Sequence, residues 1–298
     1  AWINDAQFED LAMDVLRLGR LVDIPKRDGG LRPIVVSNIL LKMTGNLILQ
    51  RSKVKCSEMQ HAIDVHDGAM RIVHLARHAA SCGKVILRFD SANAFNVASR
   101  SRIRQLLADG DPEVLRYFAT VYVPTSDLCI FGPEGARHYV RSDEGVRQGD
   151  AFSAFFFCVL MDQVCFAVKE RFPDAHVWSY MDDLTIAVEP SLADDVIRST
   201  IAIMKDIGFQ PNMTKSKCFS IDRSFVSDFL QTSHDDESFE LLGGNISSNF
   251  EAMNREQTRR NAMFLDVLRS CDIHPQLQWT ILRLCGFPKL RYYASITP

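Results

Sequence analysis

Two adjacent aspartates at the tip of an apolar strand–turn–strand segment constrain this chain most strongly. The segment runs from Val177 to Val188, reads VWSYMDDLTIAV, and has Asp182 and Asp183 near its centre. A third aspartate, Asp90, directly follows another short apolar run at residues 85–89. Carboxylates at the ends of buried strands are partly desolvated and repel one another. The pattern therefore favours a site where bound cations neutralise these charges.

Hard divalent cations suit such a cluster, because Mg²⁺ prefers oxygen ligands and also binds substrate phosphates. Two such ions can stabilise the attacking and leaving oxygens of a phosphoryl transfer. A purely structural explanation competes with this one, since Asp is common in hairpin turns. We interpret the other two acidic pairs in that structural way, as surface or loop residues: Asp194-Asp195 and Asp235-Asp236.

The hydrophobic pattern predicts helices and strands that do not alternate regularly. Apolar residues at helical spacing predict helices over residues 1–20, 38–80, 99–120, 151–170, 191–207, 251–270 and 275–285. Short β-type runs predict strands at 22–25, 31–37, 85–89 and on both sides of the turn in 177–188. Because no repeated strand–helix unit emerges, an α+β fold is favoured over a doubly wound sheet.

The remaining segments predict loops and helix ends. Residues 121–140 contain two prolines and two glycines and are predicted to form a loop or hairpin. Residues 222–240 carry one basic and six acidic side chains, a net −5, and are predicted to form a solvated loop. The last predicted helix begins at Pro275 and ends before Gly286, the expected asymmetry of proline and glycine at helix ends.

The net charge of the chain is −3, from 34 basic and 37 acidic residues, and by itself argues against a nucleic-acid partner. The charge is unevenly distributed, however. Residues 1–55 carry nine basic and six acidic side chains, a net +3, and residues 251–298 carry seven and four, again +3. The net charge therefore does not exclude nucleic acid. It predicts a modest grip on phosphates with strong salt sensitivity.

The eight cysteines include no Cys-x-x-Cys pair and are interpreted as small core residues. Such usage favours a reducing, intracellular compartment. The longest apolar run, Ala151–Met161, is too short to span a bilayer, so no membrane partner is expected. The chain starts with Ala rather than Met. A segment of a longer polyprotein, or an N-terminally processed chain, would begin in this way.

Six motifs in a fixed order resemble those of reverse transcriptases. They are IPKRDGGLRPI at 24–34, LRFDSANAFN at 87–96, EGVRQGDAFS at 144–153, YMDD at 180–183, IGFQPNMTKSK at 207–217 and LLGGNI at 241–246. YMDD alone is weak evidence, but six motifs in the family's order make a specific match over roughly residues 20–250. In style they resemble most closely the reverse transcriptases of non-long-terminal-repeat retrotransposons and group II introns.

The resemblance implies a right-hand polymerase fold of the α+β class. Residues 1–84 and part of 97–143 would form the fingers, the rest of 85–250 the palm, and 251–298 the thumb. It also implies an RNA-directed DNA polymerase that extends a DNA or RNA primer on an RNA template with dNTPs. The enzyme would be the polymerase core of a retroelement, located in the nucleus if that element is eukaryotic. The oligomeric state is left open.

The resemblance further implies two Mg²⁺ ions, for which Mn²⁺ can substitute. Asp90 and Asp182 would bind both ions, and the backbone carbonyl of Ser91 would be a further ligand. Asp183 would complete the acidic cluster with a less direct role. Lys215 would protonate the leaving pyrophosphate as a general acid, with Lys217 as its rival.

The same motifs imply contacts with the incoming nucleotide. Lys26 and Arg32 flank a Gly-Gly turn and would close over the triphosphate, Arg32 with a planar donor fork. Phe95 would lie under the sugar and exclude a 2′-hydroxyl. Gln148 would contact the nucleotide, and Gly149 would allow a close backbone approach.

Primer and template contacts are implied for a further set of residues. This set comprises Arg147, Tyr180, Met181, Gly243, Gly244, Arg255 and Arg259. Arg147 would touch the template, and the two glycines would permit close approach of the primer backbone. Arg255 and Arg259 lie one turn apart on a predicted helix and would follow phosphates. An ordinary solvated helix face is the alternative for these two arginines.

One departure and two rival functions are kept open. Relatives often have prolines after the Gln-Gly pair, where this chain has DAFSA at 150–154, so the local turn is uncertain. An RNA-dependent RNA polymerase would share the carboxylates, but Phe95 and Gln148 argue against it. A non-catalytic scaffold that binds RNA would not need three costly clustered aspartates.

Overall fold

The computed structural model describes residues 10–26, 29–52 and 55–296. Their contacts divide the chain into two compact units. The first comprises residues 1–63, 91–167 and 201–211, and the second comprises 64–90, 168–200 and 212–298. Each is described by itself below. The mixture of helices and sheets without strand–helix repeats confirms the predicted α+β class.

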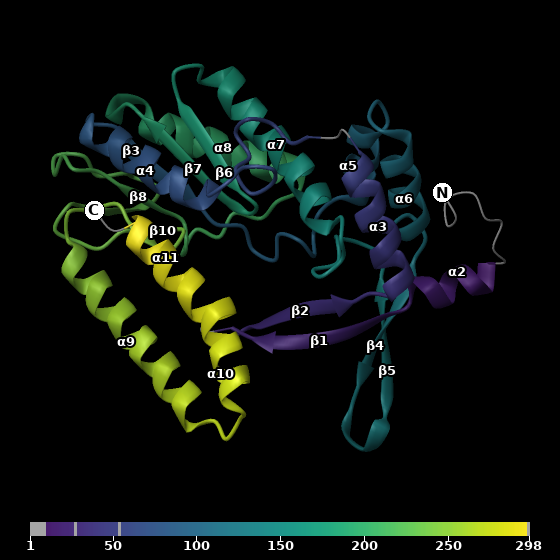
Figure 1. Ribbon diagram of the computed structural model, residues 1–298. Helices are drawn as coiled ribbons and strands as arrows, with labels where there is room; N and C mark the ends of the chain where they lie inside the picture. The colour runs from purple at the N-terminus through teal and green to yellow at the C-terminus, as the bar shows by residue number, and fades with distance from the viewer. Residues whose placement is uncertain (1–9, 27–28, 53–54, 297–298) are drawn as a thin grey trace. The chain divides into compact units, whose positions relative to one another are not determined.

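The first unit contains a four-stranded sheet in the order β2-β1-β4-β5 (Figure 1). Its strands are β1 (Gly19–Pro25), β2 (Leu31–Val36), β4 (Ser126–Phe131) and β5 (Arg137–Ser142). β1 and β2 form the predicted antiparallel hairpin, in which the Lys26 N–H donates to the Gly30 carbonyl (2.7 Å). Residues 121–140, predicted as loop or hairpin, contain most of the antiparallel β4–β5 hairpin.

Helices complete the first unit. They are α2 (Asp10–Arg17), α3 (Ile39–Arg51), α5 (Arg100–Leu107), α6 (Pro112–Val121) and the first part of α7 (Ser153–Arg171). The sequence caps three of them at the N-terminus, because Asn38 Oδ1 accepts from the Leu40 N–H, Ser99 Oγ from the Arg102 N–H and Asp111 Oδ1 from the Glu113 N–H. Aromatic rings fill the core of this unit: Tyr117, Phe118, Tyr122, Phe152 and Phe156.

The second unit contains a five-stranded sheet in the order β6-β7-β3-β8-β9. Its strands are β3 (Val85–Phe89), β6 (His176–Tyr180), β7 (Asp183–Val188), β8 (Lys217–Phe219) and β9 (Gln231–Ser233). β3 lies at the centre, antiparallel to both β7 and β8. A central strand is covered on both faces, which explains why four of its five residues are apolar and fully buried.

Helices α4 (Gly68–Ser81) and most of α8 (Ala193–Ile207) also belong to this unit, together with the short η2 turn (Pro190–Leu192). The predicted helix over 38–80 is therefore two helices, separated by non-helical residues over the described part of 52–67. Apolar residues of α4 join the sheet in one core. Its members include Ile72, Val73, Ala76, Ile86, Ala187, Phe219 and Leu241.

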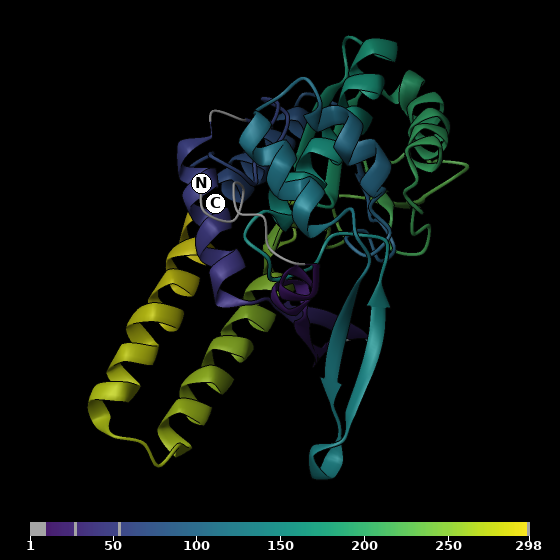
Figure 2. The same ribbon diagram turned by 90° about the vertical axis from the view of Figure 1, so that its right-hand side faces the viewer.

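The C-terminal part of the second unit begins with a two-stranded hairpin. A helical hairpin follows it, drawn in green and yellow in Figure 2. The elements are β10 (Glu240–Leu241), β11 (Gly244–Asn245), α9 (Phe250–Ser270), α10 (Pro275–Ile281), a π-turn (Leu282–Gly286) and α11 (Phe287–Ile296). The predicted helix end at Gly286 is wrong, because the helix continues to Ile296. Gly286 serves packing instead: a Cβ there would lie 3.2 Å from the Phe264 ring of α9.

Other predictions have mixed outcomes. None of the eight cysteines, all of which lie in the described residues, forms a disulfide, and four of them are buried: Cys129, Cys158, Cys165 and Cys218. The core interpretation therefore holds for half of them. The acidic pairs outside the site are structural, since Asp194 accepts from Ser227 and Asp235 from Ser248. Across the described residues, none of the helices has the length and apolar character needed to cross a membrane.

Candidate active site

Sheet register brings the three aspartates to one end of the five-stranded sheet. Phe89 of β3 lies opposite Leu184 of β7, so Asp90 and Asp183 stand at the same level just beyond that pair. Tyr180 pairs with Asp183 and closes the turn that holds Met181 and Asp182. Met181 has a left-handed backbone (φ 52°), which two-residue hairpin turns favour.

Asp183 shows that the carboxylates interact. The pKa of Asp183 is raised to about 6, mainly by burial; the Arg88 guanidinium opposes this rise, and the negative charges of Asp182 and Asp90 add to it. Arg88 lies 3.5 Å from the Asp183 carboxylate and also donates to the Glu240 carbonyl (3.0 Å). The predicted site did not include Arg88. The sequence did contain a sign of its role, because Arg88 is the only charged residue in the apolar run VILRF.

The carboxylates supply the oxygen donors that Mg²⁺ prefers. Within the described ranges, no three His, Cys, Asp or Glu side chains are grouped closely enough to hold a metal ion by themselves. Mg²⁺ is commonly held by one or two carboxylates and completed by phosphates and water. Asp90 and Asp182 fit such a partial set, while Asp183 is engaged by Arg88. Ser91 directly follows Asp90 and forms a β-bridge with Pro211.

The turn that carries Lys215 is fixed to Asp90. The Asn212 N–H donates to the Asp90 carbonyl (2.8 Å), and the Asp90 N–H donates to Ser216 Oγ (3.1 Å). Lys215 is exposed in this turn, whereas Lys217 lies half-buried in β8. Of the two lysines, Lys215 is therefore the more exposed, and it lies in the turn that is bonded to the Asp90 backbone.

The β10–β11 turn is held by Tyr292 of α11. The Tyr292 hydroxyl donates to the Leu242 carbonyl, and burial with the nearby Tyr180 raises its pKa to about 12. Gly243 needs its left-handed backbone (φ 79°). Position 244 requires glycine for a different reason, because a Cβ there would lie 2.9 Å from the Val73 side chain in the core. The buried Gly244 is thus a packing residue, whereas the close approach of a primer to Gly243 stays a prediction.

The two predicted thumb arginines lie on α9. Arg255 pairs with Glu251 (2.8 Å) and Arg259 with Glu256 (2.9 Å), and their side chains are 81% and 79% exposed. Exposed ion pairs of this kind contribute little stability. Both guanidiniums are therefore able to exchange a carboxylate for a phosphate at little cost.

In the first unit, Phe95 is held by a stacked ring and by a backbone hydrogen bond. Its ring stacks on Phe157 with centroids 4.4 Å apart and remains half-buried. The Val146 N–H donates to the Phe95 carbonyl (2.7 Å). Gly145 permits this contact, since its φ is 69° and a Cβ would lie 2.2 Å from the Asn96 carbonyl oxygen.

The Gln148-Gly149 segment is bound to β2. The Val35 N–H donates to the Gln148 carbonyl (2.7 Å), and Gly149 has a φ of 107°. A Cβ on Gly149 would lie 2.6 Å from the Val35 carbonyl oxygen. The close approach that requires this glycine is thus an approach to β2. On the same hairpin, Lys26 is half-buried and Arg32 is exposed, and neither pairs with a carboxylate among the described residues.

Arg147 does not reach a surface where a template could lie. It is only 4% exposed, and its guanidinium donates to the Arg17 carbonyl (2.9 Å) and to Ser126 Oγ. The prediction of a template contact is therefore corrected: Arg147 is buried and anchors the loop through its two terminal amino groups, while its Nε–H has no hydrogen-bond partner among the described residues. The turn that lacks prolines is held by Asp150, which accepts from the hydroxyls of Tyr117 (3.2 Å) and Tyr122 (2.5 Å).

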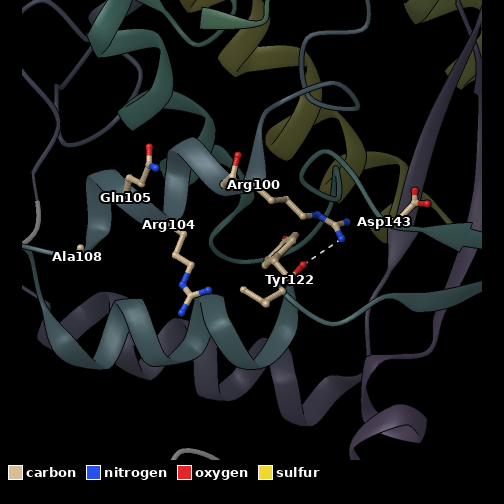
Figure 3. Close-up of a pocket in the computed structure, with 8 residues that line it drawn as sticks. Arg100, Arg104, Gln105, Ala108, Tyr122 and Asp143 are labelled. Atoms are coloured by element: carbon tan, nitrogen blue, oxygen red, sulfur yellow. Dashed lines mark hydrogen bonds between the residues drawn. The ribbon is translucent and has the colours of Figure 1, made fainter.

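Arg100 is a positioning residue that the sequence did not reveal. It borders a cavity of about 510 Å³ that Arg104 and Asp143 also line (Figure 3). The Arg100 guanidinium donates to the carbonyls of Gly145, Tyr122, Ser142 and Glu144 and to Ser142 Oγ. It thereby fixes the start of the loop that continues to Gln148. Arginine is an ordinary helix-forming residue, so the sequence held no signal for this role.

Comparisons with known proteins agree with this geometry. The family description "Reverse transcriptase (RNA-dependent DNA polymerase)" matches residues 24–246. The chain is 23% identical over 313 aligned positions to the retrotransposable element SLACS 132 kDa protein of Trypanosoma brucei gambiense, covering 98% of this chain and 25% of that protein.

Solved telomerase structures share the fold. Telomerase of Candida tropicalis in complex with a TWJ fragment of telomeric RNA has a TM-score of 0.54 and 13% identity over 78% of this chain and 44% of that one. The Candida albicans complex has a TM-score of 0.51 and 12% identity, covering 94% and 55%. The chain thus spans about a quarter of the curated relative and about half of the telomerases. The predicted right-hand polymerase fold is confirmed, and the chain belongs to the reverse transcriptase (RNA-dependent DNA polymerase) family.

Proposed function

We propose that this chain is an RNA-directed DNA polymerase that transfers nucleotides from dNTPs to a primer 3′-hydroxyl on an RNA template. The observation that carries the proposal is the convergence of Asp90, Asp182 and Asp183 at one end of the five-stranded sheet. The raised pKa of Asp183 supports it, because the cost of ionising clustered carboxylates falls when cations bind. Family membership supplies the reaction class.

Two Mg²⁺ ions are proposed at this site, with Mn²⁺ as a substitute. Asp90 and Asp182 would hold them with the Ser91 carbonyl, and Asp183 would add negative charge. When bound, the ions lower the cost of forming the 3′-alkoxide and neutralise the triphosphate. Arg88 holds the Asp183 carboxylate in place within the cluster.

The nucleotide is proposed to contact residues of the first unit. Lys26 and Arg32 would bind the triphosphate from the β1–β2 hairpin, and Gln148 would contact the nucleotide from the loop bonded to β2. Phe95, supported by Phe157, would present a ring face to the sugar and leave no room for a 2′-hydroxyl. Gly149 allows the Gln148 backbone to reach β2.

Leaving-group and primer roles are proposed for residues of the second unit. Lys215 would donate a proton to the leaving pyrophosphate, since its turn is bonded to Asp90, with the half-buried Lys217 as the rival. Tyr180, Met181 and Gly243 would contact the primer terminus.

The assignment of larger segments is also a proposal. Arg255 and Arg259 of α9 would follow phosphates. Residues 251–298 would form the thumb, residues 1–84 and part of 97–143 the fingers, and the rest of 85–250 the palm. The curated relative is a retrotransposable element protein. We therefore place this chain as the polymerase core of such an element, acting in the nucleus where the host is eukaryotic.

Extension of a DNA primer on an RNA template with Mg²⁺ tests the proposal. We expect dNTP-dependent extension that Asp182→Ala abolishes without unfolding the protein. Asp195→Ala is the matched control, because Asp195 is an exposed aspartate paired with Arg198, and we expect it to retain extension. Near-parental extension by Asp182→Ala would refute the metal assignment. Preferential use of rNTPs would favour an RNA-dependent RNA polymerase. RNA binding without primer extension would favour a non-catalytic scaffold.

A further inference from the structure

One face of the β4–β5 hairpin carries arginines and aromatic rings that the proposed reaction does not use. Residues opposite each other in a β-ladder share a face. The register places Phe131 opposite Arg137, Cys129 opposite Tyr139, and Asp127 opposite Arg141, while Arg20 of β1 lies opposite Cys129. We call the set Arg20, Phe131, Arg137, Tyr139 and Arg141 the arginine–aromatic face.

Both aromatic rings of this face are exposed to solvent. Phe131 is 48% exposed and Tyr139 is 56% exposed. The guanidiniums of Arg20 and Arg137 lie over the Phe131 ring at 5.0 and 5.8 Å from its centroid. Tyr139 stands between Arg137 and Arg141 on the same strand. Among the described residues, no cation and no second aromatic ring lies against Tyr139, so the faces of its ring are accessible.

The charge of the face is positive. Arg20, Arg137 and Arg141 are exposed, and in the described part of the chain none of these three forms an ion pair with a carboxylate. Asp127 is the one acidic side chain that the register places with them. A surface with three unpaired guanidiniums is complementary to a polyanion.

The position of the hairpin leaves this face open. β1 pairs with β4 only at Gly19–Leu128 and Arg20–Cys129, so the distal half of the hairpin continues beyond β1 (Figure 1). β5 is the edge strand of its sheet. Charged residues on an edge strand discourage pairing with other chains. That explanation accounts for the arginines of β5 but not for two exposed aromatic rings.

We propose that the arginine–aromatic face binds a single-stranded polynucleotide. A base stacks on Tyr139, and Arg137 and Arg141 bind flanking phosphates. Alternate residues of a strand lie about 6.8 Å apart, so the two guanidiniums bracket the ring along the strand. Stacking on aromatic rings combined with basic side chains is the general way in which proteins bind single strands without reading their sequence. The inference rests on the proposed function only in naming template RNA as the strand.

Fluorescence anisotropy with a labelled single-stranded oligoribonucleotide tests the face. The full chain carries Asp182→Ala, so that binding is measured apart from synthesis. We expect Tyr139→Ala to weaken binding about 5- to 150-fold, the loss of one stacked base, while Tyr139→Phe keeps parental affinity. An oligomer of the same length without bases provides the second control, since Tyr139→Ala should not change its affinity.

The phosphate contacts have their own readout. When the logarithm of the association constant is plotted against the logarithm of the salt concentration, each phosphate contact to a single strand contributes about 0.7 to the magnitude of the slope. Arg137→Gln with Arg141→Gln should therefore reduce the slope by about 1.4. Arg171→Gln is the matched control, because Arg171 is an exposed arginine over Phe172 in the second unit, at 5.9 Å from the ring centroid, and it should leave the slope unchanged.

Parental affinity and parental salt slope in both the Tyr139→Ala and the double arginine variants would overturn the proposal, and edge protection would then explain the arginines. DNA of the same sequence, run in parallel, shows whether the strand must be RNA. Primer extension by the chain with an intact Asp182 is measured separately. If the chain binds the oligoribonucleotide through this face but does not extend a primer, the proposed function alone is contradicted. If it extends a primer and all variants of the face keep parental affinity, the proposal for this face alone is contradicted.

Discussion

The Val35 N–H donates to the Gln148 carbonyl oxygen at 2.7 Å, which bonds the β1–β2 hairpin to the loop that carries Gln148. Two residues proposed to contact the nucleotide, Arg32 on the hairpin and Gln148 in the loop, are thereby linked through the backbone. Gly149 makes the approach possible. A change in the position of either segment is expected to move the other.

Gly149→Ala tests this link. Alanine at a φ of 107° is strained, and its Cβ would lie 2.6 Å from the Val35 carbonyl oxygen, so we expect a loss of stability of about 2–4 kcal/mol and a raised KM for dNTPs. Gly208→Ala is the matched control, because Gly208 has a φ of 105° with open space around the Cβ position. Urea unfolding of both variants measures the difference. Equal losses would show that backbone strain acts alone and that the contact with β2 is unimportant.

Phe95→Ala tests the proposed sugar gate. Removal of the ring that stacks on Phe157 opens space for a 2′-hydroxyl, so discrimination between dNTPs and rNTPs should fall about tenfold or more. Phe95→Tyr keeps the bulk of the ring and should keep the discrimination. The ratio of kcat/KM for the two nucleotide types is the measurement. An unchanged ratio in Phe95→Ala would remove Phe95 from this role.

Asp183→Asn tests the electrostatics of the acidic cluster. The pKa of Asp183 is raised from 3.8 to about 6, so the folded state binds this proton more tightly than the unfolded state. The linked stability is therefore present below about pH 4 and is lost as the pH rises to 6. The asparagine variant avoids that loss, and its stability relative to the parent should rise between pH 4 and 7.5.

The free energy of unfolding of Asp183→Asn relative to the parent should rise by at most about 3 kcal/mol. We expect a smaller rise than this limit, because the Asp183 side chain is 30% exposed and solvent screens its charge. Urea unfolding with EDTA at both pH values measures it. Addition of Mg²⁺ at pH 7.5 should stabilise the parent more than the variant. A relative stability that does not depend on pH would contradict the raised pKa.

Arg100→Lys tests the loop anchor. A lysine cannot reproduce the planar set of donors that Arg100 directs at four carbonyls and Ser142 Oγ, and we expect a loss of about 2–4 kcal/mol together with reduced extension activity. Arg104→Lys is the matched control, since Arg104 lies one turn further along α5 and lines the same cavity (Figure 3). Thermal unfolding compares the two. Similar melting temperatures would show that the Arg100 hydrogen bonds are replaceable.

The sequence by itself determined the parts of this protein that depend on local pattern. The apolar run 85–89 predicted a buried strand, and Asp90, Asp182 and Asp183 stood out because charged residues end or interrupt such runs only at a cost. The order of six motifs established the family resemblance, and with it the α+β polymerase fold. Local hairpins, such as the one that joins β1 and β2, were predicted because turn residues separate their strands.

Only the tertiary structure decided which partners each side chain has. Arg147 is buried against the Arg17 carbonyl, Gly244 faces Val73, and Gly286 lets α11 continue past Phe264. Each of these contacts joins residues far apart in the chain, and a one-dimensional pattern carries no information about the atoms that will fill the space around a residue. The sequence therefore predicted the candidate reactive groups, whereas packing decided which neighbouring residues hold them in place.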